Sequence, residues 1–99
     1  MTEKKNRMIL FEFDSSDYNE CLEAINVNAN ALAKIEVQTE GLCLEAVRKN
    51  GIALRHVQNQ TEKVCIAAVE QNPDALRYVE EYTEKIIYTA LKSKIKADR

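Results

Sequence analysis

Residues that break helices are scarce in this chain, which has two glycines and one proline among 99 residues. Alanine, leucine, glutamate and lysine are abundant, and these residues lose little side-chain entropy in a helix. The composition therefore favours helices and gives strands little support. Because 45% of the residues are hydrophobic, a chain of this length can bury a core as one domain.

Long apolar runs are also absent, since runs such as residues 8–11 are far shorter than a membrane span. The segment 2–7 is not followed by the apolar stretch and the cleavage site that a signal peptide has. We therefore expect no membrane association and a cytoplasmic location.

Few residues point to catalysis, metal binding or a cofactor. Cys21, Cys43 and Cys65 are odd in number and too evenly spread for a Cys-x-x-Cys metal site, so neither a disulfide nor zinc is indicated. No nucleophile, base and oxyanion donors can be assembled, and there is no phosphate-binding loop. We expect a protein that is not an enzyme and that uses no cofactor.

A repeat of 22 residues runs through the chain, marked by cysteines at positions 21, 43 and 65. Other residue types recur at the same spacing: Ala24, Ala46 and Ala68; Asn28, Asn50 and Asn72; Ala31, Ala53 and Ala75; Leu32, Leu54 and Leu76; Thr39, Thr61 and Thr83, each followed by glutamate. So many coincident positions indicate repeated structural units, and they decide the architecture.

Each unit is interpreted as two helices. The first begins after Thr39 or Thr61, whose hydroxyl can accept a hydrogen bond from an amide of the first turn. Asn50-Gly51 and Asn72-Pro73 mark the break, because Asn and Gly tolerate the left-handed conformation that ends helices and proline suits a first turn. A short second helix then turns its Ala and Leu inward.

Both ends of the chain fit the same spacing. Residues 8–13 have the composition of a strand, but the repeat predicts that they belong to the second helix of an N-terminal half unit, 6–16. Asp17 takes the capping place of threonine. At the other end, residues 84–97 are predicted to form a final helix, with Ile87, Ala90 and Leu91 in the core positions and lysines that cap the row.

We therefore predict an all-α fold, a short α-solenoid of 22-residue helix-turn-helix repeats. The single domain, 1–99, contains three full units and terminal half units. The full units comprise about 17–38, 39–60 and 61–82.

The segments 43–57 and 65–79, with the sequences CLEAVRKNGIALRHV and CIAAVEQNPDALRYV, resemble the helical repeats of the domain of unknown function 4116 family. The resemblance is specific over residues 39–84 and weaker in the first unit. It implies a helical repeat array with no assigned activity, and no catalytic residues to carry over.

Three sets of residues could have a functional role, but a structural role explains each of them as well or better. The cysteines could be nucleophiles, but their shared position, whose fourth counterpart is Ile87, favours packing. The only histidine, His56, lacks a second ligand at metal-binding spacing, and its counterparts Lys34 and Tyr78 indicate an amphipathic surface position. The repeated asparagines are best explained as helix caps.

The candidate partner-binding residues are Arg55, His56, Arg77 and Tyr78, which recur one unit apart along the second helices. Arginine and tyrosine are frequent interface anchors. The structural alternative is a solvated face with ion pairs to Glu80 or Glu81.

Charge is unevenly distributed, with acidic residues concentrated in the first half and lysines near the end. Opposite ends of two chains could attract, and a head-to-tail contact would extend the row. Self-association is therefore a hypothesis.

The predicted function is a non-catalytic protein–protein interaction module, a small adaptor or inhibitor whose partner is another protein. The alternative is nucleic-acid or other anionic-ligand binding through Arg55, Arg77 and the basic C-terminal helix. The net charge of −2 counts against this alternative, because such binding depends on neutralising phosphates.

Overall fold

The computed structural model describes residues 14–97, and over this range every regular element is a helix. The prediction of an all-α chain is confirmed there. The predicted half unit 6–16 lies mostly outside these residues, as does the choice between helix and strand for residues 8–13.

Among the described residues, three ten-residue α-helices alternate with three six-residue 3-10 helices, and a fourteen-residue α-helix follows. In chain order the elements are α2 (Tyr18–Val27), η1 (Ala29–Lys34), α3 (Glu40–Lys49), η2 (Gly51–His56), α4 (Glu62–Gln71), η3 (Pro73–Tyr78) and α5 (Glu84–Ala97).

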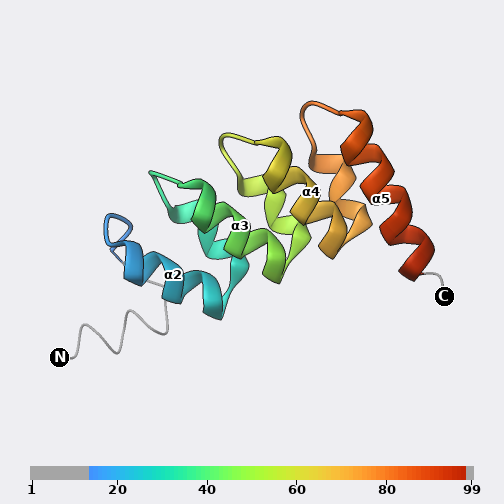
Figure 1. Cartoon of the computed structure of the whole chain (residues 1–99). Helices are drawn as coiled ribbons and strands as arrows, with labels where there is room; N and C mark the ends of the chain where they lie inside the picture. The colour runs from blue at the N-terminus through green and yellow to red at the C-terminus, as the bar shows by residue number, and fades with distance from the viewer. Residues whose placement is uncertain (1–13, 98–99) are drawn as a thin grey trace.

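The α-helices lie side by side in chain order, and the 3-10 helices form a second layer behind them (Figure 1). Each of η1, η2 and η3 packs against the α-helix before it and the α-helix after it. Among the described elements, the only other α-helices that an α-helix contacts are its neighbours in the row. A unit therefore buries its apolar side chains only with the help of the next unit.

An asparagine joins the two helices of each unit. The side-chain oxygens of Asn28, Asn50 and Asn72 accept from the N–H two residues further on, at 2.9–3.1 Å. Each asparagine N–H also donates to a carbonyl of the α-helix before it. The capping role is confirmed, but the conformation is extended, with φ between −155° and −152°, and not left-handed.

Gly51 is required for space at this junction. A Cβ atom on it would clash with the backbone oxygen of Ala68 in the next α-helix. The sequence-based explanation, a left-handed turn, is therefore wrong for Gly51. The glycine lets η2 approach α4 closely.

Threonine links units in addition to capping them. The hydroxyl oxygens of Thr39, Thr61 and Thr83 each accept from the N–H three residues on, at 3.2 Å. The hydroxyl groups of Thr61 and Thr83 in turn donate to the carboxylates of Glu40 and Glu62, at 2.8 and 2.7 Å. The recurrent Thr-Glu pair therefore connects the starts of successive α-helices.

The last residue of a unit is the main polar connection to the next one. The side-chain amide of Gln38 donates to the carbonyls of Leu32 and His56, and its oxygen accepts from the N–H of Gln58. Gln60 repeats the contacts to the next unit, since its amide donates to the Tyr78 carbonyl at 2.8 Å and its oxygen accepts from Glu80 N–H at 3.0 Å.

The core runs along the interface between the two layers. The three cysteines are 1–3% exposed, and Ile25, Val47 and Val69, one turn further along their helices, are fully buried. The thiols of Cys43 and Cys65 point at the side-chain oxygens of Gln38 and Gln60, at 3.6 and 3.4 Å. Equivalent cysteines therefore have equivalent surroundings in the second and third units.

The final helix departs from the pattern of the other α-helices. It continues through Lys94, the position at which the other units have the asparagine that ends the α-helix. Ile86 and Ala90 are its buried residues, whereas Ile87 and Leu91, expected in the core, are 41% and 57% exposed. The helix expected to cap the row with lysines presents an apolar outer face.

The glutamine contacts predict a difference between two neighbouring glutamines. Gln60→Ala removes hydrogen bonds to two groups of the next unit, so the free energy of unfolding should fall by about 1–3 kcal/mol. Gln58→Ala is the matched control, because its exposed side chain makes no hydrogen bond among the described residues, and it should cost less than about 0.5 kcal/mol. Denaturant unfolding that shows equal losses would contradict the role of Gln60.

Candidate protein-interaction surface

The predicted contact residues occupy the last two positions of adjacent 3-10 helices. Arg55 and Arg77 are exposed, and His56 and Tyr78 are partly buried. In each helix the two preceding residues, Ala-Leu, face the core, and Leu76 is the one of the four that is only partly buried. Because η2 and η3 pack against each other, the equivalent residues of the two units form a short row on the second layer.

The glutamine contacts fix the backbone of this row. The carbonyl of His56 accepts from Gln38 at 2.9 Å, and that of Tyr78 accepts from Gln60 at 2.8 Å. Each pair of site residues is thus held at its C-terminal end by the unit before it. The polar network that joins the units also sets the spacing of their exposed side chains.

Arg55 and His56 contact each other directly. The Nε–H of Arg55 donates to Nε2 of the His56 ring at 3.2 Å. Partial burial, and then the positive charge of Arg55, lower the pKa of His56 below its ordinary value of 6.5. At neutral pH the ring is therefore an uncharged acceptor that orients the guanidinium group.

The alternative interpretation placed Glu80 or Glu81 in ion pairs with the arginines. Over residues 14–97 neither Arg55 nor Arg77 forms an ion pair. The carboxylate of Glu80 instead acts on the thiol of Cys65, whose pKa it helps to raise. Both guanidinium groups are thus available to an external acidic or carbonyl group.

The row is shorter at its N-terminal end. In η1 the counterparts of Arg55 and His56 are Ala33 and Lys34, both exposed. The arginine pair is therefore specific to the second and third units, whereas a positively charged or hydrogen-bonding side chain occupies the following position in all three.

The cysteines are poorly suited to nucleophilic chemistry. Burial raises the pKa of all three thiols, and nearby carboxylates raise it further: Asp17, Asp14 and Glu20 for Cys21, Glu40 for Cys43, and Glu80 and Glu62 for Cys65. A reactive cysteine needs the opposite, a stabilised thiolate. These thiols are packing residues with a weak hydrogen bond.

A groove that the sequence analysis did not identify lies between α3 and α4, on the other layer. Its volume is about 410 Å³, and its lining includes the apolar residues Leu44, Ile66 and Ala67 beside Arg48 and Lys63. Leu44 and Ile66 share a repeat position. That recurrence was the available signal, but nothing in the sequence indicated that the position faces a groove.

Among residues 14–97, no group of three His, Cys, Asp or Glu side chains is arranged to hold a metal ion. None of the helices described is long and apolar enough to span a bilayer.

Comparison with known proteins gives no relatives: no family model, no curated protein and no solved structure matches this chain. The resemblance to the domain of unknown function 4116 repeats rests on the residues quoted above.

The environment of the cysteines predicts slow thiol chemistry. In the native protein, Cys21, Cys43 and Cys65 should resist a thiol-specific reagent such as dithionitrobenzoate, because they are buried and protonated. All three should react once denaturant is added. Val37→Cys is a suitable control, since residue 37 is 77% exposed and should react at once. Rapid reaction of a native thiol would contradict the packing role.

His56 predicts a pH effect on stability. Because its pKa is lower in the folded protein, the unfolded chain binds the proton more readily, and stability should decline as the pH falls below about 6.5. His56→Gln cannot take up this proton. The stability advantage of the wild type over His56→Gln, measured by denaturant unfolding at pH 8 and pH 5.5, should shrink at the lower pH. Parallel profiles would contradict the assignment.

Proposed function

We propose that this chain is a short α-solenoid of repeats similar to domain of unknown function 4116, and that it acts as a non-catalytic protein–protein interaction module. It would serve as a small adaptor or inhibitor that binds a protein through Arg55, His56, Arg77 and Tyr78. A cytoplasmic location, expected from the sequence, is part of this proposal.

The observation that carries the proposal is the state of the two arginines. They recur at the same position of adjacent helices, are exposed and have no acidic partner among residues 14–97. Their backbone is held in place by Gln38 and Gln60 through the neighbouring carbonyls. Exposed guanidinium groups without an acidic partner, on a backbone held in place beside a histidine and a tyrosine, favour a partner that offers carboxylates or backbone carbonyls.

Nucleic-acid binding is the competing proposal, because arginines one unit apart could also contact successive phosphates. Two arginines give a small cationic surface, and the chain as a whole carries a net charge of −2. Affinity for phosphates falls steeply with added salt, which separates this possibility from a protein partner.

The test compares two double variants in affinity capture from a lysate treated with nuclease. Arg55→Glu with Arg77→Glu should lose the specific partner, since charge reversal at an interface anchor typically costs at least about tenfold in affinity. Arg48→Glu with Lys63→Glu makes the same charge change on the groove between α3 and α4, and it should retain the partner.

Two results would overturn the proposal. If the partner is retained by the first double variant and lost by the second, the groove is the binding surface. If binding to a single-stranded oligonucleotide is tight at low salt and is lost with the arginines, the anionic-ligand function is the correct one. Circular dichroism of each variant confirms that the helices are intact.

A further inference from the structure

The outer face of α5 carries an apolar stripe. Ile87, Leu91 and Ile95 follow one another at intervals of four residues, and Tyr88 lies beside them, so all four are on one side of the helix. They are 41–62% exposed. The opposite side, with Ile86 and Ala90, is buried in the row. Figure 1 shows α5 at the end of the row, with a neighbouring α-helix on one side.

The repeat identifies this stripe as a packing face. Cys65 and Val69, the counterparts of Ile87 and Leu91 in α4, are 2% and 0% exposed because α5 and η3 cover them. The same positions in α5 keep large apolar residues with no cover from residues 14–97. Contiguous exposed apolar side chains of this kind mark an interaction site.

Over residues 14–97, the polar contacts that join one unit to the next also have no counterpart on this side of α5. Glu40 and Glu62 each accept a hydrogen bond from the threonine that begins the next unit. Glu84, their counterpart, has no hydrogen-bond partner among the described residues. At the end of the third unit, Tyr82 replaces glutamine, and its hydroxyl donates only to Leu76 of its own unit, at 3.2 Å.

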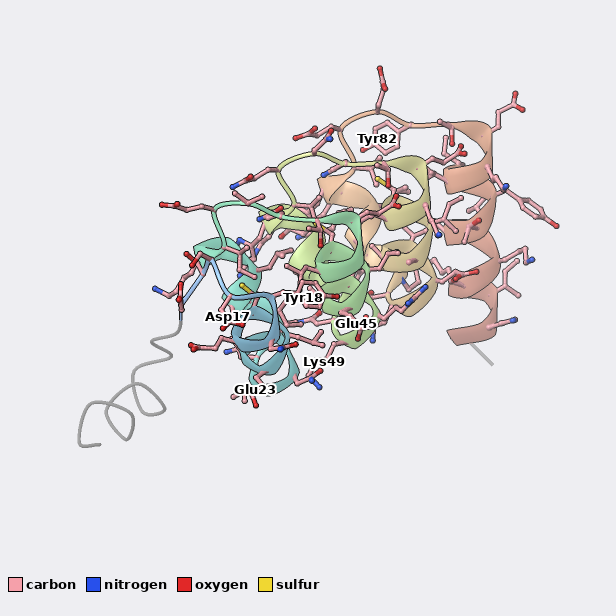
Figure 2. All side chains as sticks on the ribbon, turned by 60° about the vertical axis from the view of Figure 1, so that its left-hand side comes forward. Asp17, Tyr18, Glu23, Glu45, Lys49 and Tyr82 are labelled. Atoms are coloured by element: carbon pink, nitrogen blue, oxygen red, sulfur yellow. The ribbon has the colours of Figure 1, made fainter. Side chains whose placement is uncertain are left out.

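Among the described residues, the first α-helix of the row, α2, does not complement the stripe. Glu20 stands in α2 at the position of the buried Leu42 and Ile86, and its carboxylate accepts from the N–H of Asp14 at 2.8 Å. Asp17 stands in place of the linking threonine. In a head-to-tail stack Glu84 would meet this carboxylate, and the apolar stripe would meet Glu20. Figure 2 shows Asp17 at the start of α2, and Tyr82 in the loop before α5 at the far end of the row.

The stripe does complement itself. Ile87 and Ile95 lie at equal distances on either side of Leu91, so a two-fold axis at Leu91 brings Ile87 of one copy against Ile95 of the other. The first turn contains Glu84, and the last turns contain Lys94 and Lys96. Lys85 follows Glu84 but lies on another side of the helix, so antiparallel pairing brings Glu84 of one copy toward Lys94 of the other and opposes the two helix dipoles.

We propose that the outer face of α5 is a homodimer interface, whose occupant is α5 of a second copy packed antiparallel about Leu91. This surface is distinct from the arginine row and does not depend on the function proposed for it. One short helix from each copy buries less than a standard interface of about 800 Å² per partner, so we expect a reversible dimer with a Kd on the order of 10–100 µM.

Sedimentation equilibrium of the 99-residue chain measures this directly. The mass should rise from one to two chains with concentration and stop there, because an isologous contact closes at two. Leu91→Glu places two carboxylates at the axis and should raise the Kd by roughly 100-fold. Val37→Glu makes a similar change at a residue that is 77% exposed and lies between η1 and α3, and it should leave the Kd unchanged.

A charge exchange and a cross-link test the orientation. Glu84→Lys and Lys94→Glu should each weaken the dimer, and the double variant should recover most of the loss because the charges match again. Leu91→Cys should form a disulfide-linked dimer under mild oxidation, since residue 91 meets its own copy at the axis, whereas Val37→Cys should not. The native cysteines are buried and do not interfere.

Three outcomes would overturn the proposal. A chain that stays monomeric up to about 1 mM has no such interface. A mass that grows beyond two chains with concentration indicates a head-to-tail stack. A dimer that survives Leu91→Glu, in protein whose circular dichroism is unchanged, uses another surface.

Discussion

A glutamine side chain at the end of one unit reaches the backbone of the next, and much of the molecule depends on this contact. The amides of Gln38 and Gln60 donate to the carbonyls of His56 and Tyr78, and their oxygens accept from an N–H two residues further on. The interaction satisfies backbone groups at the end of a 3-10 helix, which water would otherwise have to solvate. It also supplies the acceptor for the neighbouring cysteine thiol.

The same contact connects the fold to the surface proposed for binding. Because the backbone carbonyl of His56 or Tyr78 is held by the preceding unit, the adjacent arginine projects from a fixed point. A pair of such points one unit apart offers a partner two guanidinium groups with little backbone entropy to lose. The surface can vary at Arg55 and Arg77 while the core beneath it is unchanged.

Much of the fold follows from the spacing of residues in the sequence. The asparagine and threonine caps were predicted because their side chains act on backbone groups two or three residues away, which a sequence displays directly. The glutamine contacts and the need for Gly51 were not, because they join residues about 20 positions apart. Ile87 and Leu91 were assigned to the core because their counterparts in the repeat are apolar. The repeat does not show whether a further helix is present to cover them. The candidate arginine row was located from its recurrence, and its role as a binding site stays a prediction.

Because the connections between successive units are equivalent, units of this type can be added to the chain. Gln38 bonds to the second unit with the same groups that Gln60 uses toward the third, and Thr61 and Thr83 meet equivalent glutamates. Duplication of residues 39–60 would bring Gln60 and Thr39 to junctions of the type that Gln38 and Thr61 already form, whereas removal of those residues would also take away Glu40, the partner of Thr61. A chain of this kind can therefore gain 22-residue segments while each new junction keeps its chemistry, so that the number of exposed side chains along the second layer can change separately from the stability of each junction.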